Sequence, residues 1–290
     1  MRTITKLLLG MAMPVALLAA QGASSATLIT QWNYENMAAF EDMGVNRFTS
    51  TNPGGAGDVT GTNPNLNANY SPIAAGIANP LLNKPTRLQW GVPSVTAGQP
   101  SALVVTDSVE GTVNTNGINV LDLTIRHDNF VIAQGQSLNT ATLLGALVLQ
   151  PALPVLGTAF GPLQAGFKIV FKETNNEGPC PVGDTPCGDI FVLDRANSDQ
   201  LTNIDLGIID GYRYTLNVVV NLTALTGAAC LGVGGGNCDG FVTAENASTP
   251  LDVFFNIRAR PVTEVPEPGI LALLGLGLAG VGFGQLRRRK

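Results

Sequence analysis

In the stretch Phe167-Lys168-Ile169-Val170-Phe171-Lys172, an extended backbone places three apolar side chains, two phenylalanines and one isoleucine, on one side and two lysines on the other. This period of two is typical of a half-buried β-strand. Runs rich in β-branched or aromatic residues recur at 101–106, 120–125, 212–220 and 251–257. Gly, Pro and Asn clusters separate these runs, and long helical patterns are scarce. The sequence predicts an all-β fold, an antiparallel, jelly-roll-like β-sandwich over residues 27–262.

Three segments depart from this strand pattern. Residues 33–42 can form a short helix. The apolar stretch 144–160 contains Pro151 and Pro154, and a proline has no N–H for a sheet ladder, so we do not expect a central strand there. The polar Gly/Asn/Pro segment 52–69 is expected to be a long surface loop.

The net charge of the predicted domain limits the classes of ligand that it can bind. The 290 residues include 16 basic and 21 acidic side chains, but six of the basic ones lie at the two ends of the chain. Residues 27–265 therefore carry 10 basic and 20 acidic groups, a net charge of −10. Such a domain repels polyphosphates, which excludes a nucleic-acid partner and favours divalent cations or neutral sugars as ligands.

Residues 1–26 have the pattern of a secretory signal peptide. Two basic residues precede the uncharged apolar run 7–20, and the small residues Ser24 and Ala26 occupy the −3 and −1 positions of a cleavage site before Thr27. The run is too short for a typical membrane span. We therefore expect export through the Sec translocon and removal of this segment by signal peptidase.

The C-terminal residues 263–290 have three parts in a fixed order. The motif Val265-Pro266-Glu267-Pro268 cannot be helical, because two prolines flank one residue. The uncharged, glycine-rich run 269–286 is long enough, as a helix, to cross a bilayer. The basic tail 287–290 would stay on the cytoplasmic side. We expect a single transmembrane helix that leaves the β-domain outside the cytoplasmic membrane.

This combination closely resembles the PEP-CTERM sorting signal of Gram-negative bacteria. The resemblance implies recognition by an exosortase, a membrane-embedded cysteine transpeptidase that cuts near the motif. The protein would be anchored transiently by its C-terminal helix, then released or attached at the cell surface or in the extracellular matrix, often an exopolysaccharide biofilm. The alternative is an unprocessed type I membrane anchor.

The four cysteines form two close pairs, Cys180 with Cys187 and Cys230 with Cys238, each in a turn-rich connector. An exported protein meets an oxidising compartment, so an even number of cysteines indicates disulfides. Four cysteines permit three pairings, of which the local one needs the least rearrangement if each pair closes a hairpin loop. A four-thiolate zinc site is disfavoured because no short C-x-x-C spacing is present.

Catalytic motifs are scarce in this sequence. His127 is the only histidine, which excludes sites built from several histidines, and no G-x-S-x-G provides a nucleophile elbow. We expect His127 to tie a strand end to a loop through hydrogen bonds from its ring. Asp184 and Asp189 flank Cys187 and are candidate calcium ligands, with solvated loop carboxylates as the alternative. No other metal or cofactor is expected.

A second resemblance, to the THxN family of PEP-CTERM proteins, spans roughly residues 86–215. Its motifs are Trp90-Gly91, His127-x-Asn129, Phe171-x-Glu173-Thr174-Asn175 and, after a cysteine pair, Asp189-Ile190-Phe191. Arg126 stands where the family motif has threonine. The resemblance implies an exported surface or matrix protein without an assigned activity. His127 and Asn129 carry over as signature residues of unknown role.

These observations favour an exported, non-catalytic surface or extracellular-matrix protein, with an exosortase and an exopolysaccharide as partners. A calcium- or carbohydrate-binding module is one alternative. The other is an extracellular glycoside hydrolase that uses Glu173 or a loop aspartate as its acid.

Overall fold

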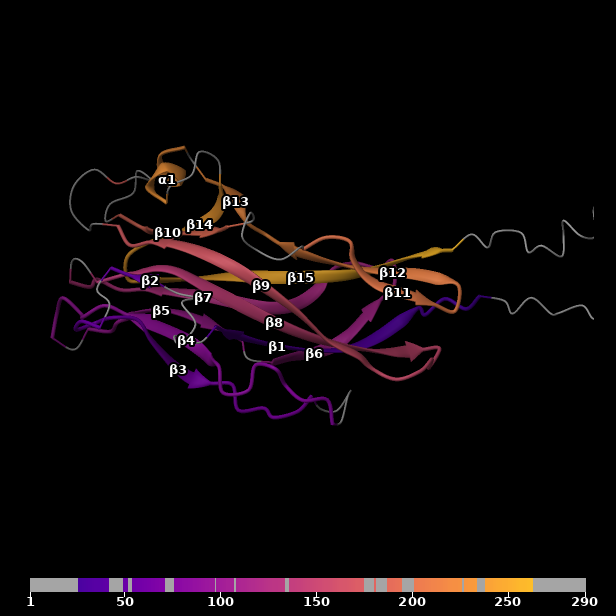
Figure 1. The fold of residues 1–290 in the computed structure, drawn as a ribbon. Helices are drawn as coiled ribbons and strands as arrows, with labels where there is room; N and C mark the ends of the chain where they lie inside the picture. Colours follow the sequence, from indigo (N-terminus) through magenta and orange to yellow (C-terminus); the bar gives the residue numbers. More distant parts are fainter. Residues whose placement is uncertain are drawn as a thin grey trace, which may run out of the picture.

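The computed structural model describes residues 26–41, 49–51, 54–70, 76–96, 98–106, 108–133, 136–174, 180, 187–194, 201–225, 227–233 and 238–262. They form two antiparallel sheets and one short helix, α1 (Gly227–Gly232) (Figure 1). The predicted signal peptide, apart from its last residue, and the predicted span at 269–286 lie outside this set. Within the described ranges, no helix is both long and apolar enough to cross a membrane.

Sheet A has the strand order β13-β14-β10-β9-β8-β1-β6, and β2 pairs with β8 beside this path. Its long central strands, β8 and β9, pair over most of their length. The strands of this sheet are β1 (Gln31–Phe40), β2 (Thr49–Ser50), β6 (Ser108–Asn114), β8 (Leu138–Leu153), β9 (Phe160–Lys172), β10 (Asp189–Leu193), β13 (Thr223–Ala224) and β14 (Asp239–Thr243).

Sheet B has the strand order β11-β12-β15-β7-β5-β4-β3. Strand β15 is an inner strand of this sheet and pairs with β12 on one side and β7 on the other. The strands of this sheet are β3 (Thr60–Pro64), β4 (Pro85–Trp90), β5 (Ser101–Val105), β7 (Val120–Asn129), β11 (Ile204–Ile209), β12 (Tyr212–Val220) and β15 (Ala247–Pro261).

The core lies between the two sheets and follows the alternation of the sequence. Phe167, Ile169 and Phe171 of β9 are buried and pack with Leu123 and Ile125 of β7 in one cluster. A second cluster gathers aromatic side chains toward the other end of the sheets, with Trp32 and Tyr34 packed against Tyr214 and Phe255. The predicted antiparallel β-sandwich is thus confirmed.

Three local expectations are wrong. The predicted helix at 33–42 is instead strand β1, whose residues 34–40 are all buried because a segment containing Tyr70 and Leu81 covers its outer face. A strand covered on both faces loses its alternation and looks like a buried helix in sequence. The predicted loop 52–69 contains the polar edge strand β3.

The third error concerns the proline-containing stretch 144–160, most of which extends the central strand β8. The pairing of β8 with β9 ends at Leu149 and Phe160, before Pro151 is reached. Pro151 therefore faces only β1, opposite Trp32, and its missing N–H leaves no gap in a two-sided ladder.

The two ends of the described domain meet at one pole of the sandwich. The backbone N–H of Thr27 donates to Asp210 at 2.8 Å, and the N–H of Val262 donates to Gly211 at 2.8 Å, both in the turn between β11 and β12. Helix α1 and strands β10 and β14 lie at the opposite pole (Figure 1). Strand β15 connects the poles over 15 residues, about 50 Å of extended chain.

Asp122 on β7 is a buried carboxyl group whose Oδ1 has no hydrogen-bond partner among the described residues. Burial raises the pKa of Asp122 to about 7. An unfolded aspartate ionises near pH 4, so between about pH 4 and 7 the unfolded chain loses a proton that the folded chain keeps. The free energy of unfolding therefore falls as the pH rises through this window.

Asp122→Asn is expected to flatten this fall, because asparagine has no proton to lose. Relative to the parent, the variant should be more stable at pH 8 than at pH 4, by up to about 4 kcal/mol. Urea unfolding of both proteins from pH 4 to pH 8 measures the difference. Parallel pH profiles for the two proteins would contradict the assignment.

Candidate functional site

Three carboxyl groups converge at the pole opposite the chain ends. Oxygen atoms of Glu173, Asp189 and Glu245 all lie within 4.8 Å of one another. Glu173 follows the last residue of β9, Asp189 is the first residue of β10, and Glu245 lies in the turn between β14 and β15. That turn carries the chain from sheet A to sheet B, so the cluster forms where the two sheets are joined.

The turn residues direct Glu245 inward. Ala244 and Asn246 are exposed, whereas Glu245 is buried. Asn246 has a φ of 56°, in the left-handed region that asparagine tolerates better than most residues. A tight turn of this kind reverses the chain within two residues and leaves one side chain pointing between the sheets.

The mouth of the β9–β10 hairpin is held by Thr174. Its backbone N–H donates to Asp189 Oδ1 at 2.9 Å, and its hydroxyl donates to the carbonyl oxygen of Cys187 at 3.0 Å. Cys187 is joined to Cys180 by a disulfide with a Cα–Cα distance of 5.0 Å. The disulfide loop therefore fixes the backbone immediately before Asp189.

Aromatic rings from sheet B and β9 enclose the carboxyl groups. Trp90, the last residue of β4, donates its indole N–H to Glu173 Oε2 at 3.0 Å. The His127 ring stacks on Trp90 with centroids 5.8 Å apart, and Phe171 packs edge-on against His127 at 4.9 Å. The Nε2 atom of His127 lies 4.0 Å from Asp189 Oδ2.

Burial controls the electrostatics of the cluster. Burial, reinforced by Glu245, raises the pKa of Glu173 to about 7, against the lowering effect of the Trp90 hydrogen bond. Burial and the Glu173 charge raise the pKa of Asp189 well above its usual range. Burial lowers the pKa of His127 to about 3, so its ring is neutral and its approach to Asp189 is not an ion pair.

The expected hydrogen-bonding role of His127 is not what the structure shows. The ring is fully buried, and neither of its nitrogens has a hydrogen-bond partner among the described residues. It is positioned by stacking instead. Asn129, two residues along the same face of β7, donates to the carbonyl oxygen of Thr243 at 3.0 Å and so ties β7 to the strand that leads to Glu245.

Arg126, where the sequence departs from the THxN motif, lies on the opposite face of β7 from His127. Its guanidinium donates to both carboxylate oxygens of Asp128, at 2.8 and 3.0 Å. Arg87 and Ser248 contact the same carboxylate. The threonine-to-arginine departure therefore leaves the buried pair His127 and Asn129 untouched.

The sequence indicates two of these three acids as candidate functional residues but does not predict that they lie together. Glu173 and Asp189 were both singled out, for different reasons, and Asp184 lies outside the described residues. Glu245 carried no signal, since an isolated acid in a predicted turn is usually solvated. The locally paired disulfides, Cys180–Cys187 and Cys230–Cys238, are confirmed, and the second starts from Cys230 within α1.

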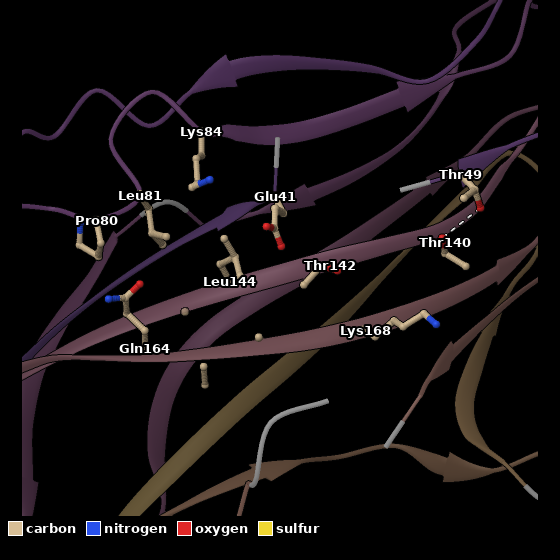
Figure 2. A pocket seen from close by; sticks show the side chains of 13 residues that line it. Glu41, Thr49, Pro80, Leu81, Lys84, Thr140, Thr142, Leu144, Gln164 and Lys168 are labelled. Carbon is tan, nitrogen blue, oxygen red and sulfur yellow. Dashed lines mark hydrogen bonds between the residues drawn. The ribbon is translucent and has the colours of Figure 1, made fainter. Parts of the chain in front are cut away.

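A second candidate site is an open groove of about 860 Å³ on the outer face of sheet A (Figure 2). Its floor comes from neighbouring positions of β8 and β9, where Gly166 faces Leu144 across the sheet and leaves the surface hollow. Polar side chains surround this hollow, and the described lining contains no aromatic ring. They are Glu41, Thr49, Lys84, Thr140, Thr142, Gln164 and Lys168.

Residues 264–289 match the PEP-CTERM protein-sorting motif, as the sequence predicted. No curated protein sequence matches the chain. The motif makes this an exported protein that an exosortase processes, with a destination at the cell surface or outside the cell of a Gram-negative bacterium. The motif itself lies outside the described residues, of which Val262, at the pole opposite the carboxyl cluster, is the last.

Removal of the Cys180–Cys187 disulfide by the double substitution Cys180→Ser and Cys187→Ser is expected to lower the free energy of unfolding by about 2–3 kcal/mol, because a short loop is released. Urea unfolding against the parent protein measures the loss. The double substitution Cys230→Ser and Cys238→Ser is the matched control, because it removes the other disulfide. It should lower the free energy of unfolding by a similar amount without altering the fluorescence of Trp90, which borders the carboxyl cluster. An unchanged unfolding midpoint after either substitution would contradict the expectation.

Proposed function

We propose that this protein is a non-catalytic component of the extracellular polysaccharide matrix, retained there after exosortase processing. The sorting motif carries the proposal, because it directs an exported β-sandwich to the surface. The resemblance to THxN proteins supports the same role. The acidic domain, with its net charge of −10, suits contact with neutral sugars.

Burial argues against the hydrolase alternative. Glu173 and Asp189 are the acids that such an enzyme would need, but Asp189 is fully buried and Glu173 is hydrogen-bonded beneath Trp90. A polysaccharide chain must place its glycosidic bond between two accessible carboxyl groups. Glu173 is partly exposed, but the fully buried Asp189 cannot serve as its accessible partner in the described structure.

The groove on sheet A supports a carbohydrate contact. Its hydroxyl, amide and ammonium groups offer donors and its glutamate offers an acceptor, which matches the alternating hydroxyls of a sugar chain (Figure 2). Without an aromatic ring in the described lining, stacking on a sugar face is not available. We therefore expect weak binding at each groove, made effective by many copies of the protein along one polymer.

Processing is tested in the bacterium that encodes the protein. The parent should end near residues 265–268, whereas the triple substitution Pro266→Ala, Glu267→Ala and Pro268→Ala should keep Lys290 and stay with the membrane fraction. Mass spectrometry of the C-terminal peptide distinguishes the two forms. Pro261→Ala, just before the motif, is the control and should be processed normally. A parent protein that still ends at Lys290 would contradict the proposal.

Polysaccharide binding is tested by cosedimentation with the exopolysaccharide of the same bacterium. Lys84→Ala combined with Gln164→Ala removes two groove contacts and should weaken binding about tenfold or more. Lys172→Ala, an exposed lysine of β9 outside the groove, should leave it unchanged. Equal binding by all three proteins would refute the groove assignment. Release of reducing ends that Glu173→Gln abolishes would instead establish the hydrolase.

A further inference from the structure

We propose that Glu173, Asp189, Glu245 and His127 bind one divalent metal ion, which joins sheet A to sheet B at the pole remote from the chain ends. Glu173 and Asp189 belong to the β9–β10 hairpin of sheet A, and His127 belongs to β7 of sheet B. Glu245 lies in the turn that passes between the sheets. The ion would therefore act as a cross-link between the two layers.

The spacing of the donor atoms fits one ion. Metal–oxygen and metal–nitrogen bonds are about 2.0–2.4 Å long, so two donors on one ion are at most about 4.8 Å apart. The three carboxylate oxygens satisfy this limit pairwise. The group within this limit consists of the three carboxylates, and His127 Nε2 meets the limit with Asp189 Oδ2, at 4.0 Å, so the ring would approach the ion from the side of Asp189.

His127 is the observation that separates this cluster from an ordinary group of acids. Its ring is fully buried, its nitrogens lack hydrogen-bond partners among the described residues, and Nε2 points toward Asp189. Leaving a buried ring nitrogen without a partner is costly. A neutral imidazole with a free lone pair is, however, the form of histidine that metals bind. Stacking on Trp90 and Phe171 holds the ring in this orientation.

The basic side chains of the neighbouring strands of sheet B are engaged elsewhere. The nearest basic side chains on β4 and β7 are Arg87 and Arg126, and both pair with Asp128 on the outer face of sheet B. Burial and the Glu173 charge raise the pKa of the Asp189 carboxyl group, and two carboxylates this close in a largely buried site are both charged only where a cation lies between them. The Trp90 hydrogen bond occupies one oxygen of Glu173 and leaves Oε1 without a hydrogen-bond partner in the described structure.

The kinds of ligand atom in the cluster indicate which divalent ion it would bind. Carboxylates alone suit Ca²⁺ or Mg²⁺, whereas an imidazole nitrogen favours ions such as Mn²⁺ and Zn²⁺. Among the described residues, two of the six carboxylate oxygens already accept hydrogen bonds, from Trp90 and Thr174, which leaves fewer than the six to eight oxygens that Ca²⁺ prefers. We therefore assign the site to Mn²⁺ or Zn²⁺, held for structure rather than for turnover, since Asp189, Glu245 and His127 are buried.

The test uses the exported protein purified without a polyhistidine tag, unfolded in chelator and refolded with or without MnCl₂, ZnCl₂ or CaCl₂. The parent should retain one Mn²⁺ or Zn²⁺ per chain after desalting and melt about 5–10 °C higher with the ion. Glu245→Gln, nearly identical in shape, should weaken retention at least about 100-fold. Glu110→Gln, which removes an exposed carboxylate of β6, should match the parent.

A measurement on the parent alone covers the case in which Glu245→Gln fails to fold. His127 is the only histidine, so nitrogen coupling of an imidazole in the pulsed EPR spectrum of the Mn²⁺-loaded protein can come from no other residue. Such coupling supports the site. Absence of retained metal, absence of imidazole coupling, equal retention by Glu245→Gln, or retention of Ca²⁺ alone would each overturn the assignment.

Discussion

Three carboxyl groups that share a water-excluded space cannot all be ionised unless something positive lies among them. This constraint governs the pole at which the two sheets of the sandwich are joined. Glu173, Asp189 and Glu245 meet there because a hairpin mouth and an inter-sheet turn converge. Trp90 and His127 close the space from the side of sheet B. At this end of the sandwich a group of polar side chains therefore borders the apolar core to which Trp90 and Phe171 belong.

The two ends of the sandwich, at opposite ends of its long strands, differ in what they contain. One pole contains both ends of the described domain, held by the turn at Asp210 and Gly211, and the sorting motif follows directly from it. The other pole holds the carboxyl cluster and both disulfides. Strand β15 runs between the two poles, over about 50 Å of extended chain.

Alternation of side chains predicted the strands that have one apolar and one polar face, such as β9 and β12. It failed for β1, because a strand buried on both faces shows no period of two. It also failed for the end of β8, since Pro151 is acceptable only where the neighbouring strand has already ended, a condition that sequence does not reveal. The disulfide pairs were predictable because each closes a short loop.

The sequence by itself determined the destination of the protein and its fold class, because a sorting motif is recognised as a linear segment and a half-buried strand has a local pattern. Tertiary structure alone decided which polar residues share a site. Glu173, Asp189 and Glu245 are separated along the chain by up to 72 positions, and His127 lies on the other sheet. Their convergence depends on the pairing order of strands and on one turn between sheets, and neither leaves a local trace in the residues concerned.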